Sequence, residues 1–386
     1  MILPFSTVKS VRQMNKPERV TTLVRIAHSG LLACLIGLMT SSTWGTEPPR
    51  YPDHQDLTYF LDGEGQKQPV RTKADWEQRR AHILAHMQTV MGPLPDASKR
   101  VPLDVQQVEE VQIGPITRRK IHYQTEPGDR VAAYLFLPMG VEEGRRRPAV
   151  LCLHQTIGIG KQEPAGLGGS PNLHYALHLA QRGYVTLAPD YPSFGEHAFD
   201  FANPSFGYGS GSMKAIWDNI RAVDLLVSLP QVDAERIGCI GHSLGGHNTM
   251  FTAVFEPRIK ALVSNCGFTR FHKYYEGRLA GWTSSRYMPK IAQVYHNNPD
   301  EVPFDFPEII ACFAPRPFLA SSPIGDGNFE VSGVRDSITS AMPIYALHGV
   351  ADRLQANYPD CGHDFPIDVR EVAYNFLDRY LRNEKN

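Results

Sequence analysis

The sequence predicts an α/β protein in which a mostly parallel central sheet carries antiparallel strands at its N-terminal side and helices on both faces. From residue 149 onward, uninterrupted apolar strands alternate with helical stretches, which is typical of parallel strands buried on both faces. Between residues 103 and 137 the apolar residues instead alternate with period two, which predicts antiparallel strands. A hydrophobic content of 42% over 386 residues is sufficient for a large core.

Residues 1–46 are expected to be a signal peptide and lead segment. Five basic residues precede an uncharged stretch at 26–44, whose apolar centre is 31–39, and small and polar residues follow it. Those basic residues are Lys9, Arg12, Lys16, Arg19 and Arg25. This order of residues is typical of a secretory signal, so we expect cleavage near Gly45 and a secreted or periplasmic location. The apolar centre is shorter than the roughly 20 residues that a membrane span needs, so we expect no stable membrane span in the mature protein. A lipoprotein anchored at Cys34 and an uncleaved anchor are the alternatives.

Residues 47–100 are expected to form an N-terminal extension with one amphipathic helix. Residues 47–71 are rich in Pro, Gly and Asp, which predicts irregular structure. The helix is predicted at 73–91, because Thr72 and Asp75 supply an N-cap and an acidic first turn, and apolar residues then recur at helical spacing. We expect this helix to pack on the main domain as a strap.

Residues 101–386 are expected to form that main domain. Antiparallel strands are predicted at 105–113, 117–125 and 130–137, and parallel strands at 149–154, 184–189, 237–240, 259–265, 317–322 and 354–358. The predicted helices cover 172–181, 213–229, 249–255, 337–347 and 368–381. Ligands of such sheets bind where the parallel strands end, so functional residues are expected in the loops after these strands.

The strongest functional signal is Gly-x-Ser-x-Gly at 241–245, which directly follows the strand at 237–240. A strand-to-helix turn this tight strains the serine backbone and leaves room only for small neighbours, which the motif glycines and Gly246 provide. The turn lifts the Ser243 hydroxyl above the end of the sheet and places the Leu244 amide at a helix N-terminus, where a developing oxyanion is favoured. The motif alone often arises by chance, but the flanking strand and helix favour a nucleophilic serine here.

A nucleophilic serine needs a base, and the base needs an acid to orient it. His363 is the expected base because it follows the last predicted strand. Asp326 is the expected acid, since it follows an apolar strand and precedes His363 by 37 residues, enough for a helix and the last strand. Asp352, in the sequence His-Gly-x-x-Asp, precedes His363 by only 11 residues, which is too few. A turn aspartate that caps residues 327 and 328 is the structural alternative for Asp326.

Residues 267–316 interrupt the alternation of strands and helices and are a candidate cap insertion. Aromatic and basic residues are interleaved in this segment. The aromatic residues are Phe268, Phe271, Tyr274, Tyr275, Trp282, Tyr287 and Tyr295, and the basic residues are Arg270, Lys273, Arg278 and Arg286. Two interpretations fit equally well: a cap whose side chains contact the substrate, or an ordinary packed helical layer.

The charge balance and the cysteine content exclude several classes of protein. A net charge of −1 provides no basic field for nucleic acid, so no nucleic-acid partner is expected.

Cys152, Cys239 and Cys266 lie in apolar runs and are expected to be buried free thiols. Five cysteines remain once Cys34 is set aside, and an odd number argues against a full disulfide framework.

Residues 131–381 resemble the α/β-hydrolases, and more narrowly their dienelactone-hydrolase-like and acetyl-xylan-esterase-like branch. The resemblance rests on Leu-His-Gln-Thr at 153–156, Pro-Asp-Tyr-Pro-Ser-Phe-Gly-Glu at 189–196, Gly-His-Ser-Leu-Gly-Gly at 241–246, Ala-Pro-Arg-Pro at 314–317 and Cys-Gly-His at 361–363. It implies a Ser-His-Asp triad, no cofactor, and ester or lactone substrates. Dienelactone hydrolases proper have a cysteine nucleophile, so Ser243 favours carboxylic esters over their lactones.

The glycine-rich loop after the strand at 149–154 is expected to supply a second oxyanion donor. By analogy with the corresponding loops of esterases, this donor is the amide of Gln155. The loop has no Gly-Lys-Ser/Thr ending and no dinucleotide fingerprint, so no phosphate-bearing cofactor is expected. A set of polar residues, His154, Glu163, Glu196 and His197, has no standard metal-ligand spacing, and we expect no metal.

Taken together, these observations predict a serine esterase that acts on a small-molecule or carbohydrate ester without a cofactor. A prolyl-oligopeptidase-like peptidase is the first alternative, although only about 100 residues precede the expected domain, too few for the propeller of those enzymes. A binding module on a hydrolase fold is the second alternative. Such modules normally lack a triad residue, whereas Ser243, His363 and Asp326 are all present here.

Overall fold

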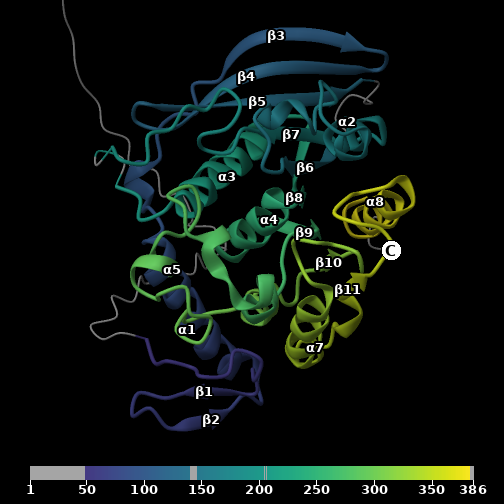
Figure 1. Cartoon of the computed structure of the whole chain (residues 1–386). Helices are drawn as coiled ribbons and strands as arrows, with labels where there is room; N and C mark the ends of the chain where they lie inside the picture. Colours follow the sequence, from purple (N-terminus) through teal and green to yellow (C-terminus); the bar gives the residue numbers. More distant parts are fainter. Residues whose placement is uncertain (1–47, 140–145, 204, 206, 383–386) are drawn as a thin grey trace, which may run out of the picture. The chain divides into compact units, whose positions relative to one another are not determined.

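The computed structural model describes residues 48–139, 146–203, 205 and 207–382 (Figure 1). The described residues contain a nine-stranded sheet with the strand order β11-β10-β9-β8-β6-β7-β5-β4-β3. Its strands in chain order are β3 (Gln106–Ile113), β4 (Ile116–Glu126), β5 (Asp129–Pro138), β6 (Arg147–Leu153), β7 (Val185–Pro189), β8 (Val232–His242), β9 (Ile259–Asn265), β10 (Phe318–Ser321) and β11 (Leu354–Asn357). The expected signal segment 1–46, with Cys34, lies outside the described residues.

The sheet is parallel over its larger part and antiparallel at one side. β6 pairs in parallel with β7 and β8, and parallel pairing continues through β9 and β10 to β11. β3, β4 and β5 form an antiparallel meander that β5 joins to β7. The turns of this meander contain Gly114 and Gly128, whose φ angles of 54° and 80° carry no steric cost for glycine. The predicted fold class is therefore confirmed.

Helices cover both faces of the sheet, as the alternating side chains of β6 demonstrate. Val150 and Cys152 pack in the same apolar cluster as side chains of α2 (Tyr175–Gln181) and α8 (Ile367–Leu381), whereas Leu151 packs in the cluster on the opposite face. The helices on that opposite face are α3 (Gly211–Ser228), α4 (Leu244–Phe255), α6 (Phe306–Ala311) and α7 (Val331–Leu347). The sheet is thus the middle layer of three and is buried on both sides (Figure 1).

The N-terminal extension differs from its prediction in two respects. Residues 47–71 were expected to be irregular, but β1 (Tyr59–Leu61) and β2 (Lys67–Pro69) form an antiparallel hairpin there. The helix α1 (Lys73–Met91) has the predicted bounds and the Thr72 cap, yet its buried face is not purely apolar. Arg79 is fully buried on that face, where it forms a 2.6 Å ion pair with Glu308 of α6. The ion pair offsets part of the cost of removing both charges from water.

The segment 267–316 consists mostly of short helical turns packed against the domain. It contains α5 (Lys290–Gln293), α6 and 3-10 helices at Phe271–Gly277 and Leu279–Trp282. Phe268, Phe271, Trp282 and Tyr295 are buried, and the rings of Phe268 and Phe306 stack at 5.2 Å. Most of the aromatic side chains of this segment therefore belong to the core. No helix in the described part of the chain is long and apolar enough to cross a membrane.

Candidate active site

Ser243 lies at the tight turn between β8 and α4. Its backbone has φ 54° and ψ −116°, a left-handed conformation that costs a non-glycine residue about 1–3 kcal/mol. A Cβ atom on Gly241 would overlap the backbone of Gly245, and a Cβ atom on Gly245 would overlap the carbonyl oxygen of Leu153. Both positions accept only glycine, so the sequence motif follows from the close packing of α4 on the end of β6.

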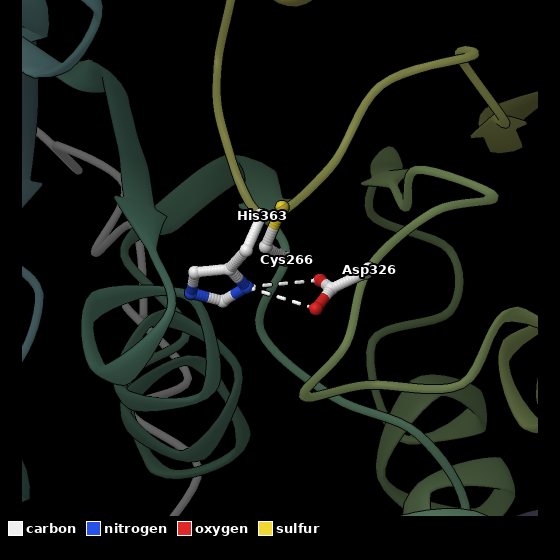
Figure 2. Close-up of side chains that lie close together, drawn as sticks. All are labelled: Cys266, Asp326 and His363. Atoms are coloured by element: carbon white, nitrogen blue, oxygen red, sulfur yellow. Dashed lines mark hydrogen bonds and ion pairs between the residues drawn. The ribbon is translucent and has the colours of Figure 1, made fainter.

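His363 and Asp326 lie side by side in the loops that follow β11 and β10 (Figure 2). The imidazole Nδ1 of His363 is 3.0 Å from each carboxylate oxygen of Asp326. Because a carboxylate only accepts hydrogen bonds, Nδ1 donates, which leaves Nε2 as the acceptor of the neutral ring. One carboxylate oxygen, Oδ1, also accepts hydrogen bonds from the amides of Asn328 at 2.8 Å and Phe329 at 3.2 Å.

These hydrogen bonds keep Asp326 ionised although its side chain is only 1% exposed. Burial raises the pKa of Asp326, but the hydrogen bond and charge of His363, together with the amides of Asn328 and Phe329, outweigh burial and lower the pKa below its usual value. Cys266 is the third side chain of this cluster (Figure 2). Burial and the neighbouring Asp326 carboxylate raise the pKa of the Cys266 thiol well above its usual value, so this thiol is uncharged.

Asp352, the alternative acid, lies at a different place in the fold. It belongs to the 3-10 helix Ala351–Arg353, which precedes β11, whereas His363 follows β11. Its side chain is 67% exposed and lies 3.5 Å from Arg379. The structure thus brings Asp326, and not Asp352, to His363.

A pocket of about 290 Å³ opens at the carboxyl edge of the sheet, and both Ser243 and His363 line it. Its lining residues are Gln155, Thr156, Ser243, Leu244, His247, Tyr274, Gly281, Trp282, Tyr287, Asn328, Phe329 and His363. The segment 267–316 contributes aromatic side chains to this pocket, but none of its four predicted basic residues lines it. Arg270 instead lies 3.2 Å from Asp336, and Arg286 lies over the ring of Phe194.

The two predicted oxyanion donors lie on adjoining backbone segments. Leu244 is the first residue of α4, and an amide at that position has no partner within its own helix. The carbonyl oxygen of His154 lies 2.9 Å from where a Cβ atom on Gly245 would be, so the loop carrying Gln155 packs on the first turn of α4. Leu244 and Gln155 both line the pocket of Ser243.

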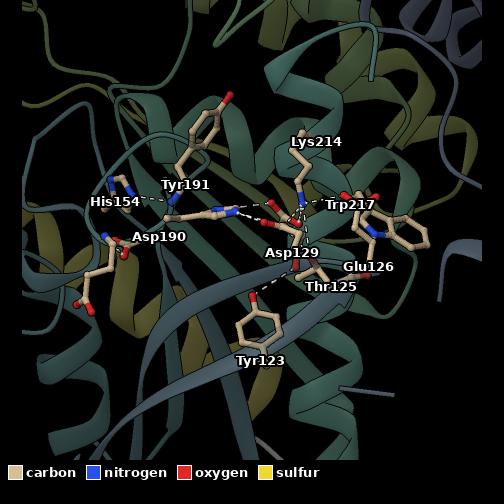
Figure 3. Close-up of polar contacts among 12 residues, drawn as sticks. Tyr123, Thr125, Glu126, Asp129, His154, Asp190, Tyr191, Lys214 and Trp217 are labelled. Atoms are coloured by element: carbon tan, nitrogen blue, oxygen red, sulfur yellow. Dashed lines mark hydrogen bonds and ion pairs between the residues drawn. The ribbon is translucent and has the colours of Figure 1, made fainter. Parts of the chain in front are cut away.

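Buried polar contacts hold the Gln155 loop in place. The Gln155 side chain donates to Glu163 at 2.9 Å, and His154 accepts a hydrogen bond from the Tyr191 amide at 2.9 Å (Figure 3). Lys161, in the same loop, is fully buried and lies 2.7 Å from Asp190 and 2.7 Å from Glu196. The loop is thereby tied to the segment that follows β7.

A second buried polar cluster lies between β5 and α3. Lys214 is its centre, and the Lys214 ammonium lies 2.6 Å from Asp129 and 3.1 Å from Glu126 (Figure 3). Possible metal-ligand atoms of Asp129, His197 and Asp218 all lie within 4.8 Å of one another. Lys214 supplies a positive charge to these carboxylates, although Nδ1 of His197 and Oδ2 of Asp218 are buried without a hydrogen-bond partner among the described residues.

The polar residues tested for metal-ligand spacing in the sequence do not form a common site. His154 accepts a hydrogen bond from Tyr191 and Glu163 accepts one from Gln155, whereas Glu196 pairs with Lys161 and His197 with Asp129.

The cysteines agree with their prediction, because Cys152, Cys239 and Cys266 are buried and free, as is Cys312. Cys361 is also free and is partly exposed.

Some pocket residues, among them His247, Gly281 and Phe329, were not singled out from the sequence, and Asn328 was considered only as a turn residue. His247 lies four residues after Ser243 on α4, and residues at that spacing share one face of a helix. This spacing could have identified it. Asn328 and Phe329 reach the pocket through the turn after Asp326, which the sequence pattern does not specify.

The fold and this arrangement of side chains define the class: the described chain has the α/β-hydrolase fold. A glucuronoyl esterase from Solibacter usitatus matches it with a TM-score of 0.67 and 18% identity, covering 86% of this chain and 98% of that one. Acetyl xylan esterase 1 from a Thermoanaerobacterium species matches with a TM-score of 0.51 and 15% identity, covering 78% of this chain and 93% of that one.

Sequence comparisons identify relatives among hydrolases. The prolyl oligopeptidase family matches residues 172–303 of this chain. YtaP of Bacillus subtilis (strain 168), whose name describes it as a hydrolase, is 27% identical over 314 residues, which is 78% of this chain and all of YtaP. The similarity to YtaP thus spans most of the described domain.

Proposed function

We propose that this protein is a serine hydrolase that cleaves carboxylic esters through an acyl-enzyme intermediate. The observation that carries the proposal is that Ser243 and His363 line one pocket while Asp326 hydrogen-bonds to His363 from the other side. The α/β-hydrolase fold and the likeness to two esterases support the proposal.

In the proposed mechanism, Nε2 of His363 takes the proton of Ser243 while the serine oxygen attacks the ester carbonyl. Asp326 holds the imidazole in the tautomer that can accept this proton and stabilises the imidazolium that forms. The amides of Leu244 and Gln155 bind the oxyanion of the tetrahedral intermediate. His363 then donates its proton to the leaving alcohol, and water hydrolyses the acyl-enzyme by the same steps.

We propose that the substrates are esters of carbohydrates with a short acyl group. Acetyl xylan esterase 1 is named for a substrate of this kind, and the glucuronoyl esterase is named for an ester whose acyl group is itself a sugar acid. A pocket of about 290 Å³ lined by aromatic side chains suits a small acyl group and a single sugar ring. A secreted or periplasmic location fits such substrates, and N-terminal sequencing of the mature protein tests cleavage near Gly45.

A peptidase activity is the second candidate, because the prolyl oligopeptidase family matches residues 172–303. That match includes Ser243 but ends before Asp326 and His363. It therefore supports a serine nucleophile without distinguishing an ester substrate from a peptide. Turnover of dipeptide p-nitroanilides, faster than turnover of every ester tested, would favour this candidate.

The test is hydrolysis of p-nitrophenyl acetate, butyrate and octanoate, and of acetylated xylan, by the wild type and by Ser243→Ala. We expect activity on the short esters and on xylan, and a loss of about four or more decades in kcat for Ser243→Ala with an unchanged Tm. A loss of only a few fold would show that Ser243 is not the nucleophile. A folded wild type that hydrolyses none of these esters would refute the esterase proposal.

A further inference from the structure

His247 is a buried polar side chain at the edge of the candidate active site. It lies on the first turn of α4, four residues after Ser243, so both residues are on one helix face. The residue is only 6% exposed, yet its imidazole lines the pocket that Ser243 and His363 also line. Trp282 lines the same pocket, is 3% exposed, and contacts His247 edge-on with ring centroids 4.8 Å apart.

Both side chains carry unused hydrogen-bonding groups. Neither ring nitrogen of His247, nor the indole nitrogen of Trp282, has a partner of normal hydrogen-bond geometry among the described residues. Other buried histidines are bonded, as His86 is to Pro49 and His242 to Asn265. A buried polar group without a good partner destabilises the folded protein, so such groups beside a pocket call for a ligand that completes them.

The chemistry of the pocket limits what that ligand can be. Of the described residues that line it, none is an aspartate, glutamate, lysine or arginine. Burial lowers the pKa of His247 to about 3 although a hydrogen bond with the Gly267 backbone opposes this shift, so the ring is neutral and its other nitrogen remains available. An uncharged group that both donates and accepts hydrogen bonds is the complement of this surface, and a hydroxyl is such a group.

We propose that His247 and Trp282 bind a neutral, hydroxyl-bearing part of the substrate, such as a sugar ring, and thereby select it over a plain alkyl or aryl ester. The imidazole nitrogen that does not face the Gly267 backbone accepts from one hydroxyl, and the indole N–H donates to a second oxygen. This inference rests on the proposed esterase function and names the residues that determine its specificity. Neither side chain takes part in the bond-breaking steps.

The experiment compares two classes of acetate ester, which form the same acyl-enzyme. One is p-nitrophenyl acetate, and the other is a set of monoacetates of methyl xylopyranoside and methyl glucopyranoside. The variants are His247→Phe and Trp282→Phe, which remove the hydrogen-bonding atoms and keep an aromatic ring in place. We expect each variant to lose about three- to ten-fold more kcat/KM on the sugar acetates than on p-nitrophenyl acetate, mainly through a higher KM.

A stability measurement separates this role from a structural one. Because the replaced atoms have no partner of normal hydrogen-bond geometry among the described residues, and only a weak contact with the Gly267 backbone, His247→Phe should leave the Tm unchanged or raise it. The control is His82→Phe on α1, whose Nδ1 lies 2.7 Å from the Tyr51 hydroxyl and which does not line the pocket. We expect this control to lower the Tm by a few degrees and to leave the ratio of the two activities at the wild-type value.

The possible outcomes are distinct. Equal losses on both ester classes, no loss on the sugar acetates, or a Tm drop for His247→Phe like that of the control would overturn the inference. A wild type that hydrolyses p-nitrophenyl acetate but none of the sugar acetates would overturn it as well and would leave the esterase proposal standing. A wild type inactive on both classes would instead refute the esterase proposal on which the inference rests.

Discussion

Replacing Asp326 with asparagine tests which carboxylate orients His363. In the folded protein the amides of Asn328 and Phe329 both donate to Oδ1, so the oxygen of the new side chain must remain at that position. The new NH2 group then occupies the Oδ2 position, 3.0 Å from Nδ1 of His363. As a donor it favours the tautomer that carries its proton on Nε2, and that tautomer cannot accept the proton of Ser243.

We expect Asp326→Asn to lower kcat by about 10⁴, as the equivalent change does in serine proteases, which corresponds to about 5 kcal/mol in the activation barrier. The matched control is Asp352→Asn, because its exposed carboxylate faces only Arg379 and should change kcat less than two-fold. The assay is kcat and KM for p-nitrophenyl acetate, with circular dichroism to establish folding. Similar losses in both variants, or a larger loss for Asp352→Asn, would refute the assignment of the acid.

Two further predictions concern the surroundings of the site. Burial raises the pKa of Asp218 from 3.8 to about 6 even though Lys214 opposes the shift, so the folded protein binds more protons than the unfolded chain between about pH 4 and pH 6. The contribution of Asp218 to the free energy of unfolding therefore falls as the pH rises through this window. Urea denaturation should show the wild type losing up to about 3 kcal/mol of stability relative to Asp218→Asn between about pH 4 and pH 6, and an unchanged difference between the two proteins would contradict this. A Cβ atom on Gly245 would overlap the Leu153 carbonyl oxygen, so Gly245→Ala should lower the stability by about 1–3 kcal/mol and kcat/KM by about 10²-fold. Gly158→Ala, in the adjoining loop, meets nothing within 4 Å and should change neither, and equal effects would disprove the steric argument.

Elements with strong local signals were predicted to the residue. The bounds of α1 agree because Thr72 and Asp75 form a capping box that only a helix start uses, and Gly92 ends the helix. The strand at 259–265 agrees because it is a short run rich in β-branched and apolar residues between turn residues. In both cases the information lies within a few neighbouring residues.

Elements whose signals come from distant contacts were missed or shortened. The helix after Ser243 begins at Leu244, although glycine-rich residues 244–248 have low helix propensity, because packing against β6 and β9 holds them helical. The hairpin of β1 and β2 and the start of α7 at Val331 were likewise not evident in the local pattern. The buried Arg79 is another example, since its ion-pair partner Glu308 lies far along the chain and its guanidinium also stacks on the ring of Tyr51.

The candidate site residues could be grouped from chain order, because the pairing of parallel strands places the ends of successive strands at one edge of the sheet. The strands β8, β9, β10 and β11 end level with one another, since their last or nearly last residues are successive register partners: His242, Asn265, Ser321 and Asn357. Ser243 directly follows the first of these ends, and Asp326 and His363 follow the ends of β10 and β11 by short loops, so all three lie at one edge. Asp352 precedes β11, so it lies at the other end of that strand, away from the edge where Ser243, Asp326 and His363 are found. Strand pairing does not determine which other side chains line the pocket. The positions of His247 and Trp282 depend instead on how the side chains of α4 and of the segment 267–316 pack together, which chain order does not show.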